Sequence, residues 1–352
     1  MSKESLAWLN SNVLVGFTSK RGNAWHYRAS DQGVEPNHYE GAIPVADVRR
    51  RLFDWEPVSV PMTAIVPDTI SADGVTAGFT ITDTDRQVIV NPKSREIMGA
   101  FKSGYQAHGY GEWLVSKVDT VLDGGLAIGS AGLLSRGAVA WVQVELPETI
   151  THDASGVQFR PFVTACTSLD GSLATTYVSG NSVVVCDNTL SAALGDSDAL
   201  KVKIKHTRYS HFRAGEIRDA LGLVSTMAED FMAELDVLTT DTVSDAELSA
   251  FLDAYVPVKD KSGETLKGRS LTMAQNKRDG LMQLWNFDNR VSPWKGTAFG
   301  VLQMANTFSQ HEGIVRGVNA RAERNAMDFL TGKVDKLDAA VLDTLASVRT
   351  AA

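Results

Sequence analysis

Residues 137–146 read Gly-Ala-Val-Ala-Trp-Val-Gln-Val-Glu-Leu. Within this stretch Val142 and Val144 alternate with Gln143 and Glu145. A period of two is typical of an antiparallel strand that buries one face and leaves the other in water. The stretch therefore predicts an antiparallel sheet that is exposed on one side.

The strand pattern continues on both sides of this segment. Between residues 126 and 207 it predicts strands at 126–134, 137–146, 159–169, 173–179, 182–186 and 201–206. Residues 57–100 also favour strands, most simply as a meander, because β-branched and aromatic residues lie between breaks rich in Pro, Gly and Asp. Residues 111–122 favour a helix that ends at Gly124-Gly125.

From residue 214 onward the apolar spacing becomes helical. It predicts helices at 214–238, 244–255, 271–288, 293–311, 318–330 and 333–348, with a mobile loop at 259–268. The resulting fold class is α+β, an antiparallel β-sheet core with packed helices followed by an all-helical C-terminal region. We expect three parts: an N-terminal arm and short helix at 1–56, a sheet domain at 57–210 and a helical domain at 211–352.

Composition describes an ordinary globular protein. Of the 352 residues, 43% are hydrophobic and 22% are charged, which argues against disorder. The two cysteines, Cys166 and Cys186, are too few for a disulfide scaffold, and we expect them to pack as small apolar residues. Neither a signal peptide nor a membrane span is expected, so a cytoplasmic location is predicted.

Charge is segregated along the chain. The net charge is −8. Residues 201–218 hold six basic groups and one acidic group, or +5, whereas residues 219–258 hold nine acidic groups and no Lys or Arg, or −9. The negative net charge argues against a protein that binds nucleic acid over its whole surface, because such binding needs many cations near phosphates. A local basic site is not excluded.

The sharpest basic feature is Lys201-Val202-Lys203-Ile204-Lys205, which Arg208 and Arg213 follow. As a strand it places three ammonium groups on one face about 6.6 Å apart, since each residue rises about 3.3 Å. That spacing suits contacts with a phosphate backbone. The alternative is a solvated face, or an edge strand whose lysines prevent pairing between sheets.

A second basic set surrounds two tryptophans. Its members are Lys259, Lys261, Lys267, Arg269, Lys277, Arg278 and Arg290, near Trp285 and Trp294. Basic grooves with aromatic platforms bind single-stranded nucleic acid without sequence preference. The alternative is that both tryptophans pack in the core at a helix corner.

No motif predicts catalysis, a metal or a cofactor. The seven histidines form no H-x-x-x-H pair, and no CxxC is present. The glycine-rich run at 124–132 matches neither GxxxxGK[ST] nor GxGxxG before a helix. Asp170-Gly171 is most simply a hairpin turn. We therefore expect a protein that is not an enzyme.

Several landmarks occur in a characteristic order. They are Ala24-Trp25-His26, Leu52-Phe53-Asp54-Trp55, Leu169-Asp170-Gly171-Ser172, Val185-Cys186-Asp187-Asn188-Thr189-Leu190, Lys205-His206-Thr207 and Gly296-Thr297-Ala298-Phe299-Gly300. In this order they resemble the phage- and plasmid-borne family catalogued as domain of unknown function nine-three-two. The family's antiparallel sheet with added helices is similar, at fold level, to the RecT, Erf and RAD-type single-strand annealing proteins of phage recombination.

The resemblance and the charge pattern together give two hypotheses. The first is a non-enzymatic protein of a phage or mobile element that binds single-stranded DNA, anneals strands in homologous recombination and assembles into a homo-oligomeric ring or filament. Its phosphate contacts would be Lys201, Lys203, Lys205, Arg208, Arg213, Lys277, Arg278 and Arg290. The second is an accessory protein that binds a host protein through the acidic segment at 219–258. Trp25 and His26 could serve either function or only fix the N-terminal arm.

Overall fold

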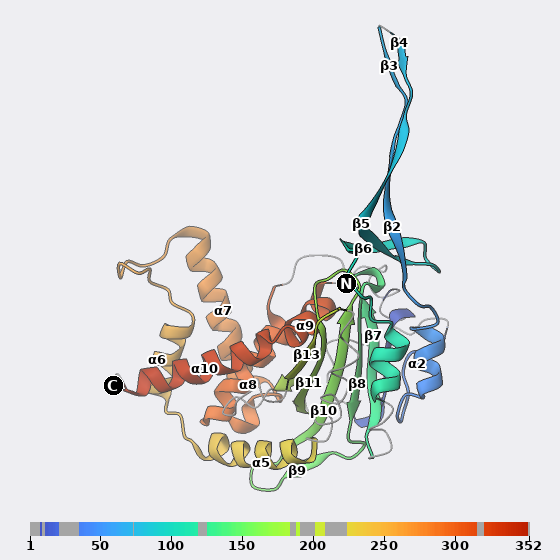
Figure 1. Ribbon diagram of the computed structural model, residues 1–352. Coiled ribbons are helices and arrows are strands. Elements are labelled where there is room, and N and C mark those ends of the chain that lie inside the picture. Colours follow the sequence, from blue (N-terminus) through green and yellow to red (C-terminus); the bar gives the residue numbers. More distant parts are fainter. Residues whose placement is uncertain are drawn as a thin grey trace.

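A computed structural model describes residues 8, 11–20, 35–72, 74–118, 125–183, 188–190, 201–207, 224–314 and 320–350. A central antiparallel sheet is flanked by helices, a helical region follows it, and a long hairpin projects away from the body (Figure 1). The predicted α+β class is confirmed.

The main sheet joins segments from both ends of the first 207 residues. Its strands are β1 (Val13–Val15), β7 (Ala127–Leu134), β8 (Val139–Glu145), β9 (Ile150–His152), β10 (Val157–Ser168), β11 (Thr175–Val183), β12 (Asn188–Leu190) and β13 (Lys201–Ile204). Their order is β1-β7-β8-β10-β11-β12, with β9 on β10 and β13 on β11, and all pairs are antiparallel. The six-residue turn around Asp170-Gly171 joins β10 to β11, as expected of a hairpin.

The expectation of one water-exposed face is wrong for the centre of this sheet. Strands β7, β8 and β10 are buried on both faces along almost their whole length. The polar residues of β8 do not mark a face in water, because Gln143 is half-buried and Glu145 is fully buried. Glu145 lies 3.6 Å from Arg160 of β10, which is also fully buried. A carboxylate paired in this way can occupy a covered face.

The segment at 57–100 forms the predicted meander, but most of it leaves the body. Strands β2 (Val58–Val66), β5 (Phe79–Asn91) and β6 (Glu96–Lys102) pair in the order β2-β5-β6. At the far end, β3 (Thr69–Ser71) pairs with β4 (Gly74–Thr76). We call residues 58–83 the arm. Figure 1 shows it extending well beyond the other elements, and all described residues of β2, β3 and β4 are exposed.

Helices cover the sheet and build the C-terminal region. They are α2 (Val45–Arg51), α5 (Val224–Thr240), α6 (Asp245–Tyr255), α7 (Gly268–Phe287), α8 (Ala298–Thr307), α9 (Ala320–Leu330) and α10 (Lys333–Thr350), with shorter turns η1 (Thr18–Lys20), η2 (Gly111–Ser116), η3 (Ser135–Gly137), η6 (Ser292–Trp294) and η7 (Phe308–Glu312). Helix α6 begins with a capping box, in which Ser244 and Glu247 bind each other's backbone N–H. The helix predicted over 293–311 is divided into η6, α8 and η7. Gly296, with a φ of 84°, lies between η6 and α8.

Part of the segment at 1–56, which the sequence predicts to be an N-terminal arm and a short helix, belongs to the main sheet. Strand β1 pairs with β7 inside the main sheet, and Leu14 and Val48 are fully buried. Trp25 and His26 lie outside the described residues. The loop predicted to be mobile at 259–268 contains a closed turn, in which Lys259 and Thr265 form a β-bridge.

Three apolar clusters hold the chain together. One lies between the sheet and α2 with η2, and a second joins the helices α5 to α8 and α10. A third packs Phe329, Leu330 and Val334 against the opposite face of the sheet. The second and third clusters contain side chains from both sides of the domain boundary expected near residue 210, so the helices and the sheet share buried surface.

The buried Glu145–Arg160 pair makes a stability prediction. Glu145→Ala should lower the free energy of unfolding by about 3–5 kcal/mol, because it leaves a buried guanidinium without its carboxylate. Urea denaturation would measure the loss. Glu148→Ala, at an exposed position nearby, should change it by less than about 0.5 kcal/mol. Similar values for the two variants would contradict the prediction.

Candidate nucleic-acid interface

Strand β13 positions the lysines that the sequence singled out. It pairs with β11 in register, with Val202 opposite Tyr177 and Ile204 opposite Thr175, and Ile204 is fully buried in the cluster beneath α2 and η2. Alternation therefore places the lysines of β13 on the opposite face of the sheet. Lys203 and Lys205 are exposed. Among the described residues β13 pairs with β11 alone, so it lies at an edge of the sheet.

Three members of this basic group cannot be placed completely. Arg208 and Arg213 lie outside the described residues, and only the backbone of Lys201 is described. The backbone of Lys201 begins β13 and pairs in register with Val178. Lys203 in β13 and Lys205 directly after it are the members whose exposure the structure describes, and a phosphate-binding role for the group stays a prediction.

The three secondary cations are engaged within the helical region. Lys277 lies 4.4 Å from the ring centroid of Tyr255, and burial lowers the pKa of its ammonium group. Arg278 forms an ion pair with Asp253. Figure 1 shows their helix, α7, standing apart from β13. These cations and the β13 lysines thus lie in different parts of the fold.

Arg290 is held by two carboxylates. It donates to Asp288 at 2.6 Å and to Glu312 at 3.2 Å. Because its guanidinium group hydrogen-bonds to Asp288, the pKa of Arg290 is raised and that of Asp288 is lowered. A phosphate would have to displace these partners, so Arg290 remains a prediction that the geometry does not strengthen.

Both tryptophans are core residues, which was the alternative interpretation. Trp285 is 2% exposed and Trp294 is 8% exposed. Trp294 packs edge-on against Phe299 and donates from its indole N–H to the carbonyl of Ser155 at 3.2 Å. Neither ring offers a face on which a base could stack.

Four of the nine acidic residues in the segment at 219–258 pair with basic side chains of the same chain. Asp241 and Glu247 bind Arg349 at 2.7 and 2.8 Å. Asp236 accepts a hydrogen bond from His152 at 2.9 Å, and Asp253 pairs with Arg278. Four of its carboxylates therefore have partners that fix helices to one another or to β9.

A stack of five rings lies where β13 ends. Phe101 stacks on Tyr105 at a centroid distance of 3.8 Å, Tyr105 on His206 at 5.0 Å, His206 on His108 at 4.1 Å, and His108 on Trp113 at 3.9 Å. The series begins in β6, at the base of the arm, and ends in η2, in the core. It therefore ties the arm and the basic strand to the same buried support.

Threonine hydroxyls hold the two histidines in place. His108 Nδ1 lies 2.6 Å from Thr175 Oγ1, and His206 Nε2 lies 3.1 Å from Thr167 Oγ1. Burial lowers the pKa of His206 to about 4, partly opposed by a backbone hydrogen bond at Gln106. His206 is therefore neutral at physiological pH and adds no charge to the lysine row.

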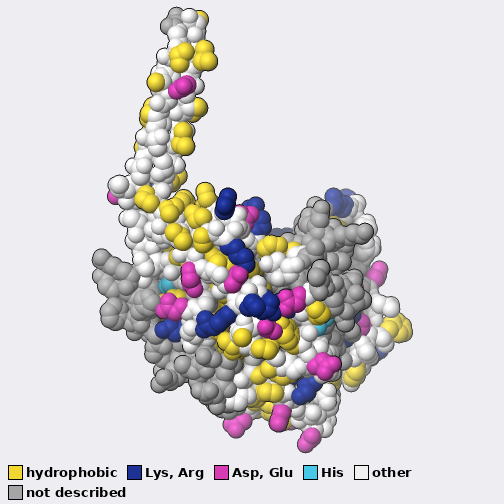
Figure 2. All heavy atoms as spheres, turned by 90° about the vertical axis from the view of Figure 1, so that its right-hand side faces the viewer, with side chains coloured by type: hydrophobic (Ala, Val, Ile, Leu, Met, Phe, Trp, Pro, Cys, Tyr) yellow, Lys and Arg dark blue, Asp and Glu magenta, His cyan; other side chains and the backbone are white. Residues whose placement is uncertain are grey.

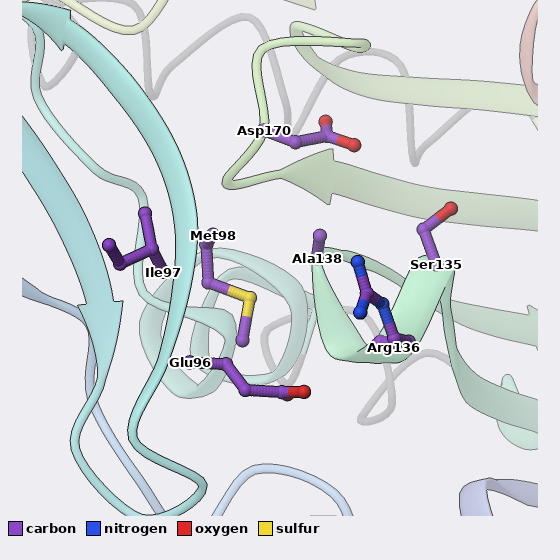
Figure 3. Close-up of a pocket in the computed structure, with 7 residues that line it drawn as sticks. All are labelled: Glu96, Ile97, Met98, Ser135, Arg136, Ala138 and Asp170. Atoms are coloured by element: carbon purple, nitrogen blue, oxygen red, sulfur yellow. The ribbon is translucent and has the colours of Figure 1, made fainter.

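A pocket of about 500 Å³ opens between the base of the arm and two turns of the main sheet. Figure 3 shows Glu96 and Met98 from β6 facing Arg136 from the β7–β8 turn, with Asp170 above them. Ser135 and Arg136 both have positive φ, 49° and 57°, which is costly for residues other than glycine. A pocket lined by one cation, Arg136, and two carboxylates, Glu96 and Asp170, suits a small polar group better than a nucleic-acid backbone.

Charge on the visible side of the arm's base is mixed. Figure 2 shows Lys and Arg interleaved with Asp and Glu over that face, with apolar side chains where the arm joins the body. Within the described ranges, no three His, Cys, Asp or Glu side chains gather to hold a metal ion. Each helix there is too short or too polar to cross a bilayer. Cys166 is buried, and Cys186 lies outside those ranges.

Residues 98–329, about two thirds of the chain, match the family described as Domain of unknown function (DUF932). The chain belongs to the DUF932 family. The DUF932 match begins within β6 and ends within α9, so it includes the ring stack and β13 but not the arm. Nothing among the curated proteins or the solved structures matches the chain, and the likeness to annealing proteins stays a prediction.

Sequence reasoning missed the ring stack and the pocket. Their members come from separate strands, and only tertiary structure brings them together. One signal was available, because Lys205-His206-Thr207 and Asp170-Gly171 were both among the recurring landmarks. These landmarks lie at the same end of the sheet, since β13 ends at Ile204 opposite Thr175, the first residue of β11 after the β10–β11 turn.

The lowered pKa of His206 predicts acid sensitivity. Between about pH 6.5 and pH 4 the unfolded chain binds a proton that the folded chain excludes, so stability is complete above this window and falls as the pH decreases through it. Urea denaturation at about pH 7 and about pH 4 should show a loss about 3 kcal/mol larger in the wild type than in His206→Gln. An equal loss in the two proteins would contradict this cause.

Proposed function

We propose that this DUF932 protein binds single-stranded DNA along the lysine face of β13 and promotes the annealing of complementary strands. It would act as a non-enzymatic protein of a phage or other mobile element during homologous recombination. The observation that supports the proposal most is the exposure of Lys203, within the edge strand β13, and of Lys205, directly after it, in the strand that Lys201 begins. Lysines about 6.6 Å apart can follow a flexible phosphate backbone.

The arrangement favours a strand contact over a compact anion site. Lys203 and Lys205 project from a rigid sheet, and Ile204 between them is anchored in the core. The strand is followed directly by His206, which the aromatic stack fixes. A rigid row of cations would bind single-stranded DNA of any base sequence, because ion pairs with phosphates carry no base information. Annealing requires this property.

The proposal predicts a specific change in salt dependence. The triple variant Lys201→Glu, Lys203→Glu, Lys205→Glu should bind a labelled single-stranded oligonucleotide more weakly. The slope of log K against log salt should decrease in magnitude by about 2, since each lost phosphate contact contributes about 0.7. Fluorescence anisotropy at several salt concentrations would measure both quantities, with a duplex of the same sequence for comparison.

The control changes two exposed lysines elsewhere, Lys102→Glu with Lys336→Glu, which alters the net charge by −4 against −6 in the triple variant. This variant should retain the wild-type slope. No binding by the wild-type protein at low salt, or equal weakening in both variants, would refute the β13 site. The first of these results would also favour the hypothesis of a host-protein partner.

A further inference from the structure

The arm carries an apolar face that nothing in the described structure covers. Met62, Ala64 and Val66 of β2 share this face with Phe79 and Ile81 of β5, because Val66 pairs with Phe79 and Ala64 with Ile81. Asp83, which pairs with Met62, adds one carboxylate at the end of the face nearest the body. Phe79 is 58% exposed and Ile81 is 51% exposed. Exposed apolar stripes of this kind on soluble proteins mark contacts with a partner.

The opposite face of the arm differs in chemistry. It carries Thr63, Thr80 and Thr82 together with Ile65, and the hydroxyls of Thr63 and Thr82 lie 3.2 Å apart. The arm is therefore amphipathic, with one face suited to water and one suited to burial. An isolated two-stranded ribbon is marginal in water, so covering the apolar face also stabilises the arm itself.

The charge of the arm selects its partner. Residues 57–85 contain Asp68, Asp73, Asp83 and Asp85 and no Lys, Arg or His. This acidic stretch is repelled by nucleic acid and by anionic lipid. Two arms packed face to face would also bring like charges together. The expected partner surface is therefore basic and includes some apolar area.

The chain itself provides such a surface at another position. We call residues 257–273, between α6 and the first turns of α7, the basic projection. Its four cationic side chains, Lys259, Lys261, Lys267 and Arg269, are exposed and make no hydrogen bond or ion pair with any residue that the structure describes. The segment also holds Asp260 and Glu264, so its net charge is +2. Met273, which closes the segment, is 55% exposed.

The basic projection also lacks cover from its own chain. Helix α7 buries only Leu281, Leu284 and Trp285 among its 20 residues, all in its last two turns. Its first nine residues are exposed or half-exposed. Figure 1 shows the arm and the α6–α7 connection at opposite ends of the molecule, so one chain cannot bring them together.

We propose that the apolar face of the arm binds the basic projection of a second copy of this chain. The carboxylates of the arm meet Lys259, Lys261, Lys267 and Arg269, while Phe79 and Ile81 cover the apolar surface around Met273. Because the two surfaces differ and lie far apart on each chain, the contact is head-to-tail. Such contacts repeat, and they generate rings when the rotation closes or filaments when it does not.

The test measures association without nucleic acid, so it succeeds or fails independently of the DNA-binding proposal. Sedimentation velocity of the full chain over a range of concentrations reports the average mass. The arm variant is Phe79→Ser with Ile81→Ser, and the projection variant is Lys261→Glu with Lys267→Glu. All four side chains are exposed, so folding should be unchanged by circular dichroism.

The wild type should form species larger than one chain that grow with concentration, whereas each variant alone should remain at the mass of one chain. Mixing the two variants should give a species of two chains and nothing larger. Each mixture retains one intact arm and one intact projection, which can form a single contact. This outcome distinguishes head-to-tail binding from arm-to-arm pairing, in which the projection variant would assemble alone.

Two controls match the variants in composition. Ile65→Ser with Thr80→Ser alters the other face of the arm, and Lys102→Glu with Lys336→Glu repeats the charge change elsewhere. Both should assemble like the wild type. The proposal is overturned by a wild type that stays at one chain at every concentration, by a mixture that does not associate, or by flotation of the protein with phosphatidylcholine vesicles through Phe79 and Ile81.

Discussion

Strand β10 is buried along almost its whole length, and the other parts of the fold are arranged around that burial. Its side chains enter all three apolar clusters: Val163 and Ala165 face α2 and η2, Phe162 and Cys166 face α9, and Phe159 reaches into the helical region. Burying one such apolar side chain contributes about 1.5–3 kcal/mol. Helices are therefore required on both faces of the sheet, and the C-terminal half supplies those that cover the second face.

The same constraint explains where polar chemistry occurs. In the middle of the sheet, polar groups must bind one another, as Glu145 and Arg160 do, because unpaired charges there would be costly. At the edge, β13 can present lysines to water while Ile204 remains in the core. The arm leaves the body near the end of β13, to which the ring stack joins its base, and its apolar side chains such as Phe79 have no internal role. The two binding proposals thus rest on features that do not serve the core.

The ring stack connects the base of the arm, the end of β13 and the core through ring contacts. It extends from Phe101 beside the arm, through His206 after the basic strand, to Trp113 in the core. Gln87 of β5 adds a hydrogen bond to the carbonyl of Tyr105 at 2.7 Å. The stack lies within the DUF932 match, whereas the arm lies before it. The basic strand therefore belongs to the matched region, and the arm lies outside it.

The sequence by itself determined the fold class and most element positions, because these depend on local periodicity, and it singled out the lysines of β13. Alternation in Lys201–Lys205 is sufficient to place its charges on one face. Tertiary structure decided what each residue faces. It buried Glu145 beside Arg160, placed Trp285 in the core, gave Arg290 two carboxylate partners and left Phe79 in water. These outcomes depend on residues far apart in the sequence, whose contacts no local pattern contains.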